Sequence, residues 1–204
     1  VKLGKDVSFF EWVEQYGSPE FKARVKAQRK RFLDMDKSLF DSLVWRETME
    51  KQDLTTMEFW SDYWRDEISP EELNGVRTYT GSGYSEMNKY LRGKISATRF
   101  EDEIKHATAA LEKASLPEEV IARRGTDYNI LTELGVEISE ANKDKLIGSV
   151  VTDKGFMSTS PSPGGGFSGT IEYIIKVPKG SQAMYIDPIS VNRGEEELLI
   201  NRGG

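Results

Sequence analysis

The chain has 204 residues, of which 37% are hydrophobic and 30% are charged, and its formal net charge at pH 7 is −6. This composition is typical of a globular protein with one large or two small domains and enough residues to bury a core. The acidic balance argues against a nucleic-acid partner, because phosphate binding needs a surplus of lysine and arginine. No apolar stretch approaches a membrane-spanning helix in length, and residues 1–6 lack the apolar run of a signal peptide.

The scarcity of Cys and His restricts the chemistry that the chain can perform. It has no Cys and a single His, His106. Thiol nucleophiles, disulfides and thiolate metal sites are therefore excluded, as are metal sites built from several histidines. We expect no metal, and catalysis that rests on carboxylates, arginines and hydroxyl groups.

The first half of the chain carries repeated signals for the start of a helix. Ser18 precedes Pro19 and an acidic residue, which is typical of a capped helix with proline in its first turn. Three further pairs have the spacing of a capping box, namely Thr55 with Glu58, Ser69 with Glu72, and Thr98 with Glu101.

After Pro117 the pattern changes to short apolar runs that are separated by Gly and Pro. A capped amphipathic helix at about residues 139–147 interrupts this pattern. The predicted strands are residues 119–124, 150–160, 170–177, 182–187 and 195–200. Helices followed by strands favour an α+β fold with a mixed, mainly antiparallel sheet.

An acidic run stands directly before the last apolar run, Leu198-Leu199-Ile200. In an extended strand, Glu195 and Glu197 would share one face while Glu196 points away. When two carboxylates lie close together, their repulsion raises the pKa of at least one of them, unless a cation or a hydrogen-bond donor binds the pair. By itself the run is equally typical of a solvated turn before a core strand.

Two other predicted strands end in polar residues. Arg123 and Arg124 precede Gly125, and a guanidinium at a strand end can bind phosphate or carboxylate with two hydrogen bonds. Ser158, Thr159 and Ser160 end the next strand, and alternation places the two serines on one face. Either motif alone is also typical of an ordinary surface edge.

Taken in order, the arginine, Ser-Thr-Ser and Glu-x-Glu motifs resemble one class of mono-ADP-ribosyltransferases. The segment from Tyr79 to Tyr84, followed by Asn88-x-x-Leu91-Arg92, is similar to the part of that family that helps to form its NAD pocket. The resemblance extends over about residues 75–204. It is greatest to the actin-modifying catalytic subunits of clostridial and insecticidal binary toxins.

The resemblance implies a domain organisation. Residues 1–75 would form an N-terminal helical region that packs on a catalytic core, residues 76–204, which is possibly truncated at its C-terminus. The core would be a β-sandwich with a central NAD cleft. The family also implies a protein that is secreted or delivered into a host cell, or a phage- or bacterium-encoded intracellular effector, with flanking domains or a separate delivery component.

The implied reaction cleaves the nicotinamide–ribose bond of NAD and passes ADP-ribose to an arginine of a target protein, for which actin is plausible. Glu197 would stabilise the oxocarbenium-like transition state and hold a ribose hydroxyl. Ser158 would orient Glu197, and Glu195 would orient the acceptor guanidinium. Arg123 completes the catalytic set that the resemblance implies.

The resemblance also implies which residues bind NAD, with no metal. Arg123 would contact the phosphates with support from Arg124, although relatives with a single arginine directly before glycine favour Arg124 instead. Phe167 lies in a Gly-rich loop that would contact NAD and the target. The full implied set is Tyr79, Asn88, Arg92, Arg123, Arg124, Ser158, Thr159, Ser160, Phe167 and Glu197. An NAD glycohydrolase and a non-catalytic partner-binding module with a degenerate fold are the alternatives.

Overall fold

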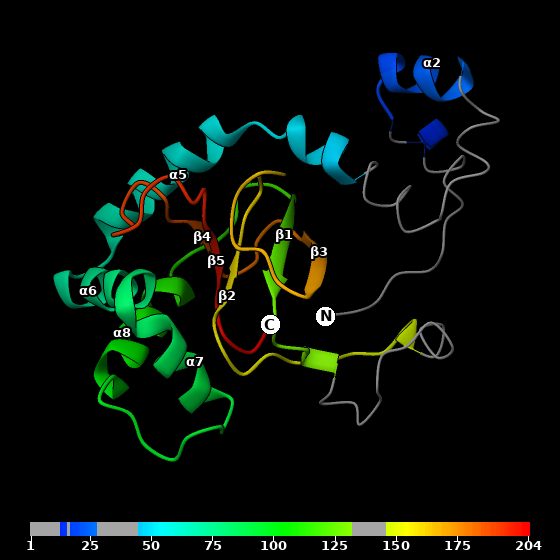
Figure 1. Cartoon of the computed structure of the whole chain (residues 1–204). Coiled ribbons are helices and arrows are strands. Elements are labelled where there is room, and N and C mark those ends of the chain that lie inside the picture. The colour runs from blue at the N-terminus through cyan, green and yellow to red at the C-terminus, as the bar shows by residue number, and fades with distance from the viewer. Residues whose placement is uncertain (1–12, 16, 28–44, 132–145) are drawn as a thin grey trace.

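The computed structural model describes residues 13–15, 17–27, 45–131 and 146–204 (Figure 1). Most of the helix expected at residues 139–147 lies outside these ranges. The described helices are α2 (Pro19–Ala27), α5 (Leu54–Glu67), α6 (Pro70–Thr78), the π-helical turn η1 (Tyr79–Gly83), α7 (Tyr84–Leu91) and α8 (Glu101–Glu112). The described strands are β1 (Val120–Thr126), β2 (Met157–Thr159), β3 (Ile171–Val177), β4 (Ala183–Tyr185) and β5 (Leu198–Ile200). No helix in this part of the chain is long and apolar enough to cross a membrane.

The strands form two antiparallel sheets. β1 pairs with β3 along its whole length, and β5 lies between β2 and β4. Arg123 and Ser160 join the sheets, because each donates its backbone N–H to the other's carbonyl at 2.8 Å. The α+β class is confirmed, whereas the sandwich arrangement remains a prediction. This junction brings the end of β1 beside the end of β2.

Helices cover one side of the strands. Figure 1 shows α6, α7 and α8 gathered beside β2 and β5, with α5 running past β4 and α2 drawn apart from the sheets. The indole N–H of Trp64 donates to the Ala110 carbonyl at 2.8 Å, which fastens α5 to α8. A Cβ on Gly75 would lie 2.7 Å from the Ala107 nitrogen, so glycine allows α6 and α8 to pack closely.

The main core lies between these helices and the strands. Burial of a large apolar side chain contributes about 1.5–3 kcal/mol, so this core fixes α7 and η1 against β2 and β5. Its members include Trp64, Val76, Tyr79, Met87, Leu111, Phe156, Ile186 and Leu199. The division expected between residues 75 and 76 stays a prediction, and α6 runs across it.

The helix starts were predicted with mixed success. Ser69 and Glu72 form a complete capping box at α6, and the Ser18 hydroxyl accepts a hydrogen bond from the backbone N–H of Phe21 at 3.0 Å. The box predicted at Thr55 is wrong, because α5 begins one residue earlier and Asp53 caps it. The box at Thr98 is also wrong, since no side chain caps α8. The hydroxyl of Thr98 instead donates to Glu86.

Candidate active site

A cavity of about 230 Å³ opens between the helices and the two sheets. It is bordered by η1 and α7 on one side and by β1, β2 and the segment before β5 on the other. The predicted site residues that line it are Tyr79, Asn88, Arg123, Arg124, Ser158, Thr159, Phe167, Glu195 and Glu197. Arg92 and Ser160 are not among its lining residues.

The backbone conformation of the Glu-x-Glu segment differs from the one that the sequence predicts. β5 begins at Leu198, so the three glutamates are not part of the strand. Glu196 has a left-handed backbone with φ of 51°, which overturns the expected extended alternation. Glu195 and Glu197 nevertheless both line the cavity.

Burial dominates the electrostatics of Glu197, which is 4% exposed. Burial raises the pKa of its carboxyl from 4.5 to about 7. A hydrogen bond with Ser158 opposes this rise and the negative charge of Glu195 adds to it, while Arg124 and Asp187 have smaller effects in opposite directions. Glu197 is therefore close to half-ionised near neutral pH.

Glu195 is less buried than its partner. Burial is again the main cause of its raised pKa, followed by the negative charge of Asp187. The two carboxyl groups thus have different environments, one deep in the cavity and one nearer solvent. Such a difference lets two like groups take different roles.

Adjacent arginines on β1 have different partners. Arg123 donates through Nε to Glu172 and through Nη1 to the Gly165 carbonyl, both at 2.8 Å, and so fastens the loop after β2 to β1 and β3. Arg124 donates to the carbonyl of Ser158. Its guanidinium lies near Tyr79 and Glu197, and burial lowers its pKa.

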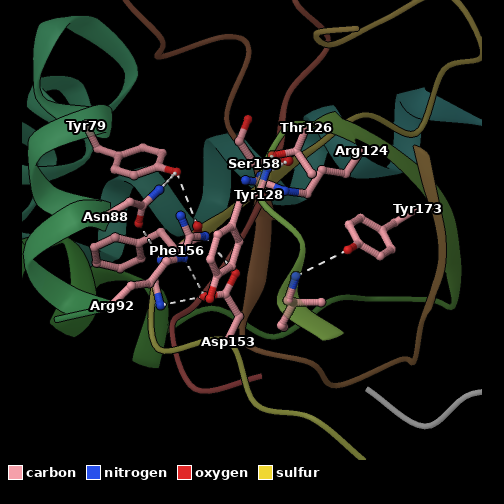
Figure 2. Close-up of polar contacts among 12 residues, drawn as sticks. Tyr79, Asn88, Arg92, Arg124, Thr126, Tyr128, Asp153, Phe156, Ser158 and Tyr173 are labelled. Carbon is pink, nitrogen blue, oxygen red and sulfur yellow. Dashed lines mark hydrogen bonds and ion pairs between the residues drawn. The ribbon is translucent and has the colours of Figure 1, made fainter. Parts of the chain in front are cut away.

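A hydrogen-bonded chain connects α7 to the strand that carries the Ser-Thr-Ser motif (Figure 2). Asn88 donates from Nδ2 to the Tyr79 hydroxyl at 3.0 Å and accepts at Oδ1 from the backbone N–H of Phe156 at 2.9 Å. The rings of Tyr79 and Phe156 pack edge to face at 5.2 Å. Asn88 therefore places Tyr79 at the cavity wall and fixes the start of β2.

Arg92 is engaged away from the cavity lining. Its Nε and Nη2 donate to the two carboxylate oxygens of Asp153 at 2.8 and 2.7 Å, and its guanidinium lies over the Tyr128 ring at 4.1 Å (Figure 2). Asp153 also accepts from the backbone N–H of Gly155. The pair orders the turn before β2, and the phosphate contact implied for Arg92 stays a prediction.

The three hydroxyl residues at the end of β2 differ in what they contact. Ser158 borders the cavity beside Glu197. The hydroxyl of Thr159 donates to the Leu198 carbonyl at 2.7 Å and ties β2 to β5. Ser160 is buried, and its hydroxyl accepts from the backbone N–H of Ser162 at 3.2 Å. Of the three side chains, Ser158 is therefore the one beside a predicted catalytic group.

The Gly-rich loop, residues 161–170, lies across the end of β1. A Cβ on Gly125 would be 2.1 Å from the carbonyl oxygen of Phe167, and one on Gly169 would be 2.3 Å from the Thr126 nitrogen. These close approaches require glycine. They hold the exposed Phe167 ring at the mouth of the cavity.

Several residues that shape the site were not predicted from the sequence. Asp187 and Thr80 anchor the loop before β5, and Tyr84, Asp127 and Asn192 line the cavity. The sequence offered one weak signal for two of these residues, because Thr80 and Tyr84 lie within the Tyr79–Tyr84 motif that was expected to help form the NAD pocket. Among the residues that the structure describes, no group of acidic or histidine side chains could hold a metal ion.

The arrangement suits one kind of chemistry. A buried carboxylate beside a hydroxyl stabilises positive charge that develops on a bound sugar. A guanidinium on the same wall binds phosphate well. A second carboxylate nearer solvent can orient a polar or cationic acceptor.

Comparisons with known proteins agree with this chemistry and define the class. The chain belongs to the ADP-ribosyltransferase exoenzyme family, whose model matches residues 59–204. It is 27% identical over 199 residues to the NAD(+)–arginine ADP-ribosyltransferase EFV of Enterococcus faecalis, covering 91% of this chain and 40% of that protein. It is 31% identical over 153 residues to the mono-ADP-ribosyltransferase C3 of Clostridium botulinum D phage, covering 66% and 61%. The chain thus spans less than two thirds of either relative.

A solved structure confirms the fold. The protein is similar to Plx2a, an ADP-ribosyltransferase toxin from Paenibacillus larvae, with a TM-score of 0.59 and 25% sequence identity. The match covers 78% of this chain and 83% of that one. The family resemblance predicted from the three motifs is confirmed.

Proposed function

We propose that this protein transfers ADP-ribose from NAD to an arginine side chain of a target protein. One observation carries the proposal: Glu195 and Glu197 line the same cavity as Arg124, although the turn between the two glutamates is left-handed. The name of the Enterococcus faecalis relative, an NAD(+)–arginine ADP-ribosyltransferase, supports an arginine acceptor.

The first step breaks the bond between the ribose C1′ and the nicotinamide nitrogen. The electron pair of that bond leaves with nicotinamide, which departs as a neutral molecule, and positive charge develops on the ribose. The ionised carboxylate of Glu197 stabilises this charge. Ser158 supports the ionised form, since its hydrogen bond lowers the pKa of Glu197.

The second step forms a bond from C1′ to a nitrogen of the acceptor guanidinium, which then releases a proton to solvent. An arginine stays protonated at ordinary pH, so a carboxylate is better suited to orient and polarise it than to deprotonate it beforehand. Glu195 has the position for this role, because it lines the cavity and is more exposed than Glu197. Glu196 has no role in either step.

We assign the binding of NAD phosphates to Arg124 and a supporting role to Arg123. Arg124 lies beside Tyr79 and Glu197, whereas the guanidinium of Arg123 already binds Glu172 and Gly165. The phosphates of NAD would compete with these two partners at Arg123. Tyr79 and Phe167 would border the bound dinucleotide.

For the target we propose a host protein, with actin as the first candidate, and entry into the host cell by a separate or flanking delivery component. Similarity to Plx2a, an ADP-ribosyltransferase toxin, supports a toxin or effector role. The acidic net charge of −6 also fits a protein target better than a nucleic acid.

The decisive experiment is transfer of label from adenylate-labelled NAD into proteins of a host-cell lysate, and into purified actin. We expect labelled protein with the wild type, and loss of both labelling and NAD cleavage in Glu197→Gln. Glu195→Gln should cleave NAD but label no protein. Mass spectrometry of the labelled protein should locate ADP-ribose on arginine.

The outcomes separate the alternatives. NAD cleavage by the wild type without labelled protein, in lysates from several host types, would indicate a glycohydrolase. Equal NAD turnover by the wild type and Glu197→Gln would contradict the enzymatic proposal and favour a non-catalytic module. Glu101→Gln, at an exposed position of α8, controls for the loss of one charge.

A further inference from the structure

The segment that carries both glutamates is a loop between β4 and β5, residues 186–197. Its start and its end are joined by one side chain. Asp187 Oδ1 accepts hydrogen bonds from the backbone N–H of Gly194 at 2.9 Å and of Glu196 at 2.8 Å. A single carboxylate oxygen therefore holds the chain on both sides of Glu195.

The hydrogen bond to Glu196 coincides with an unusual backbone conformation. Glu196 is the one non-glycine residue with positive φ in the described part of the chain. This left-handed conformation is unfavourable for a residue with a side chain. The conformation differs from that of an extended strand, and with it Glu195 and Glu197 both line the cavity.

Other contacts of this loop come from backbone groups or lie at its tip. At the turn, the Glu195 carbonyl accepts a hydrogen bond from the backbone N–H of Gly166 at 3.1 Å. The backbone N–H of Ile186 donates to the Glu197 carbonyl at 2.8 Å, which continues the pairing of β4 with β5. At the tip, Val191 and Asn192 donate to Thr80 of η1 at 3.2 and 2.8 Å. Asp187 is the side chain that these bonds place at the turn itself.

We propose that Asp187 is a positioning residue of the transferase reaction: it holds the turn at residues 194–196 so that both glutamates face the cavity together. The proposal rests on the function proposed above, because the geometry matters only if both carboxylates act on one reaction. Asp187 contacts neither substrate. It acts through the backbone of the loop.

The charge of Asp187 gives a second, independent readout. At Glu195, burial is the main cause of the raised pKa, and the negative charge of Asp187 is the second. At Glu197, Asp187 also raises the pKa, but less than burial and Glu195 do. The other groups that influence the Glu197 carboxyl are Ser158, Glu195 and Arg124, and Tyr79 lies nearby. Replacing Asp187 with a neutral residue should therefore lower both glutamate pKa values.

Three variants separate position from charge. Asp187→Asn keeps an oxygen that can accept both backbone hydrogen bonds, so it should retain most of kcat while lowering the pKa of Glu197. Asp187→Ala removes the acceptor and should reduce kcat for transfer by about 10²-fold, as a small misplacement of catalytic groups does. KM for NAD should change little, because Arg124 is untouched.

The third variant tests the left-handed turn directly. Glycine adopts positive φ without steric cost, so adding Glu196→Gly to Asp187→Ala should restore part of the lost kcat. Glu196→Gly alone should remain near wild type. A residue that merely stabilised the fold would not be rescued in this way. Asp66→Asn, at an exposed position of α5, is the matched control.

Two measurements make the test decisive. Initial rates of transfer give kcat and KM, and a ¹³C NMR titration of labelled Glu carboxyl groups, assigned with Glu197→Gln, gives the Glu197 midpoint without any activity. Full activity of folded Asp187→Ala, or absence of rescue by Glu196→Gly, overturns the proposal. If the wild type modifies no protein, the proposed function fails, while the NMR titration still reports on Asp187.

Discussion

Glu197 is buried with a pKa near 7, far above the 4.5 of an exposed glutamate. Between these two values the folded protein binds more protons than the unfolded chain, so the free energy of unfolding falls as the pH rises. Each pH unit corresponds to about 1.4 kcal/mol, which gives an upper bound of roughly 3 kcal/mol for the stability lost by pH 8. The carboxylate that we propose acts on NAD is thereby kept in a place where its ionised form destabilises the fold.

This cost predicts that Glu197→Gln stabilises the protein at high pH. Relative to the wild type, its free energy of unfolding should be greater by up to about 3 kcal/mol at pH 8, and this advantage should vanish toward pH 4. Urea unfolding at the two pH values, with Glu101→Gln as control, measures the difference. A difference that does not depend on pH would contradict a raised pKa at Glu197.

The two arginines of β1 lead to a second prediction at the residue scale. Arg124→Gln should raise the dissociation constant for NAD by about 10- to 10²-fold, as expected for loss of a hydrogen bond to a charged group. Arg123→Gln should have a smaller effect, because it loosens the loop after β2 rather than a direct phosphate contact. Isothermal titration with NAD tests both variants, and a larger effect at Arg123 would reverse the assignment.

At the level of elements, the loop over β1 is the clearest case of a local requirement for glycine. Gly125→Ala would place its Cβ 2.1 Å from the Phe167 carbonyl oxygen, so either β1 or the loop must shift. We expect weaker NAD binding and a stability loss of about 1–3 kcal/mol. Gly164→Ala is the matched control, since a Cβ there would meet nothing within 4 Å. Equal effects of the two substitutions would show that the close contact is unimportant.

The elements that the sequence predicted well are those with local signals. The strands at 119–124 and 170–177 match β1 and β3 to within two residues, and the capping box at Ser69 is present. The box predicted at Thr55 failed because the neighbouring Asp53 caps the helix instead. Competition between adjacent polar residues is hard to judge from spacing alone.

The contacts that the sequence did not predict join distant segments. Arg92 and Asp153 are 61 positions apart, and although a motif contains Arg92, no local pattern marks Asp153 as its partner. The turn at Glu196 depends on Asp187, nine positions earlier, so an extended strand was the natural expectation from the acidic run. Motif order predicted most of the residues that meet in the cavity, with Arg92 and Ser160 as exceptions, whereas the backbone conformation that brings them together required the structure.

On the scale of the whole molecule, the cavity lies between two parts that are otherwise joined by the apolar core. Tyr79 and Asn88 come from the helical side, while Arg124 comes from β1 and Glu197 from the loop directly before β5. The Asn88–Phe156 hydrogen bond is one of the few polar links between these parts in the site. A dinucleotide in this cavity would contact both sides at once.

NAD should therefore stabilise the whole fold against heat. A ligand at 100 times its dissociation constant adds about 2.7 kcal/mol, and a protein of this size gains about 2–4 °C in Tm for each kcal/mol. We expect a rise of roughly 5–10 °C, the same in Asp66→Asn and much smaller in Arg124→Gln at equal NAD concentration. Differential scanning calorimetry measures this shift. Absence of a shift in the wild type at millimolar NAD would show that the cavity does not hold the dinucleotide, whatever the motifs around it.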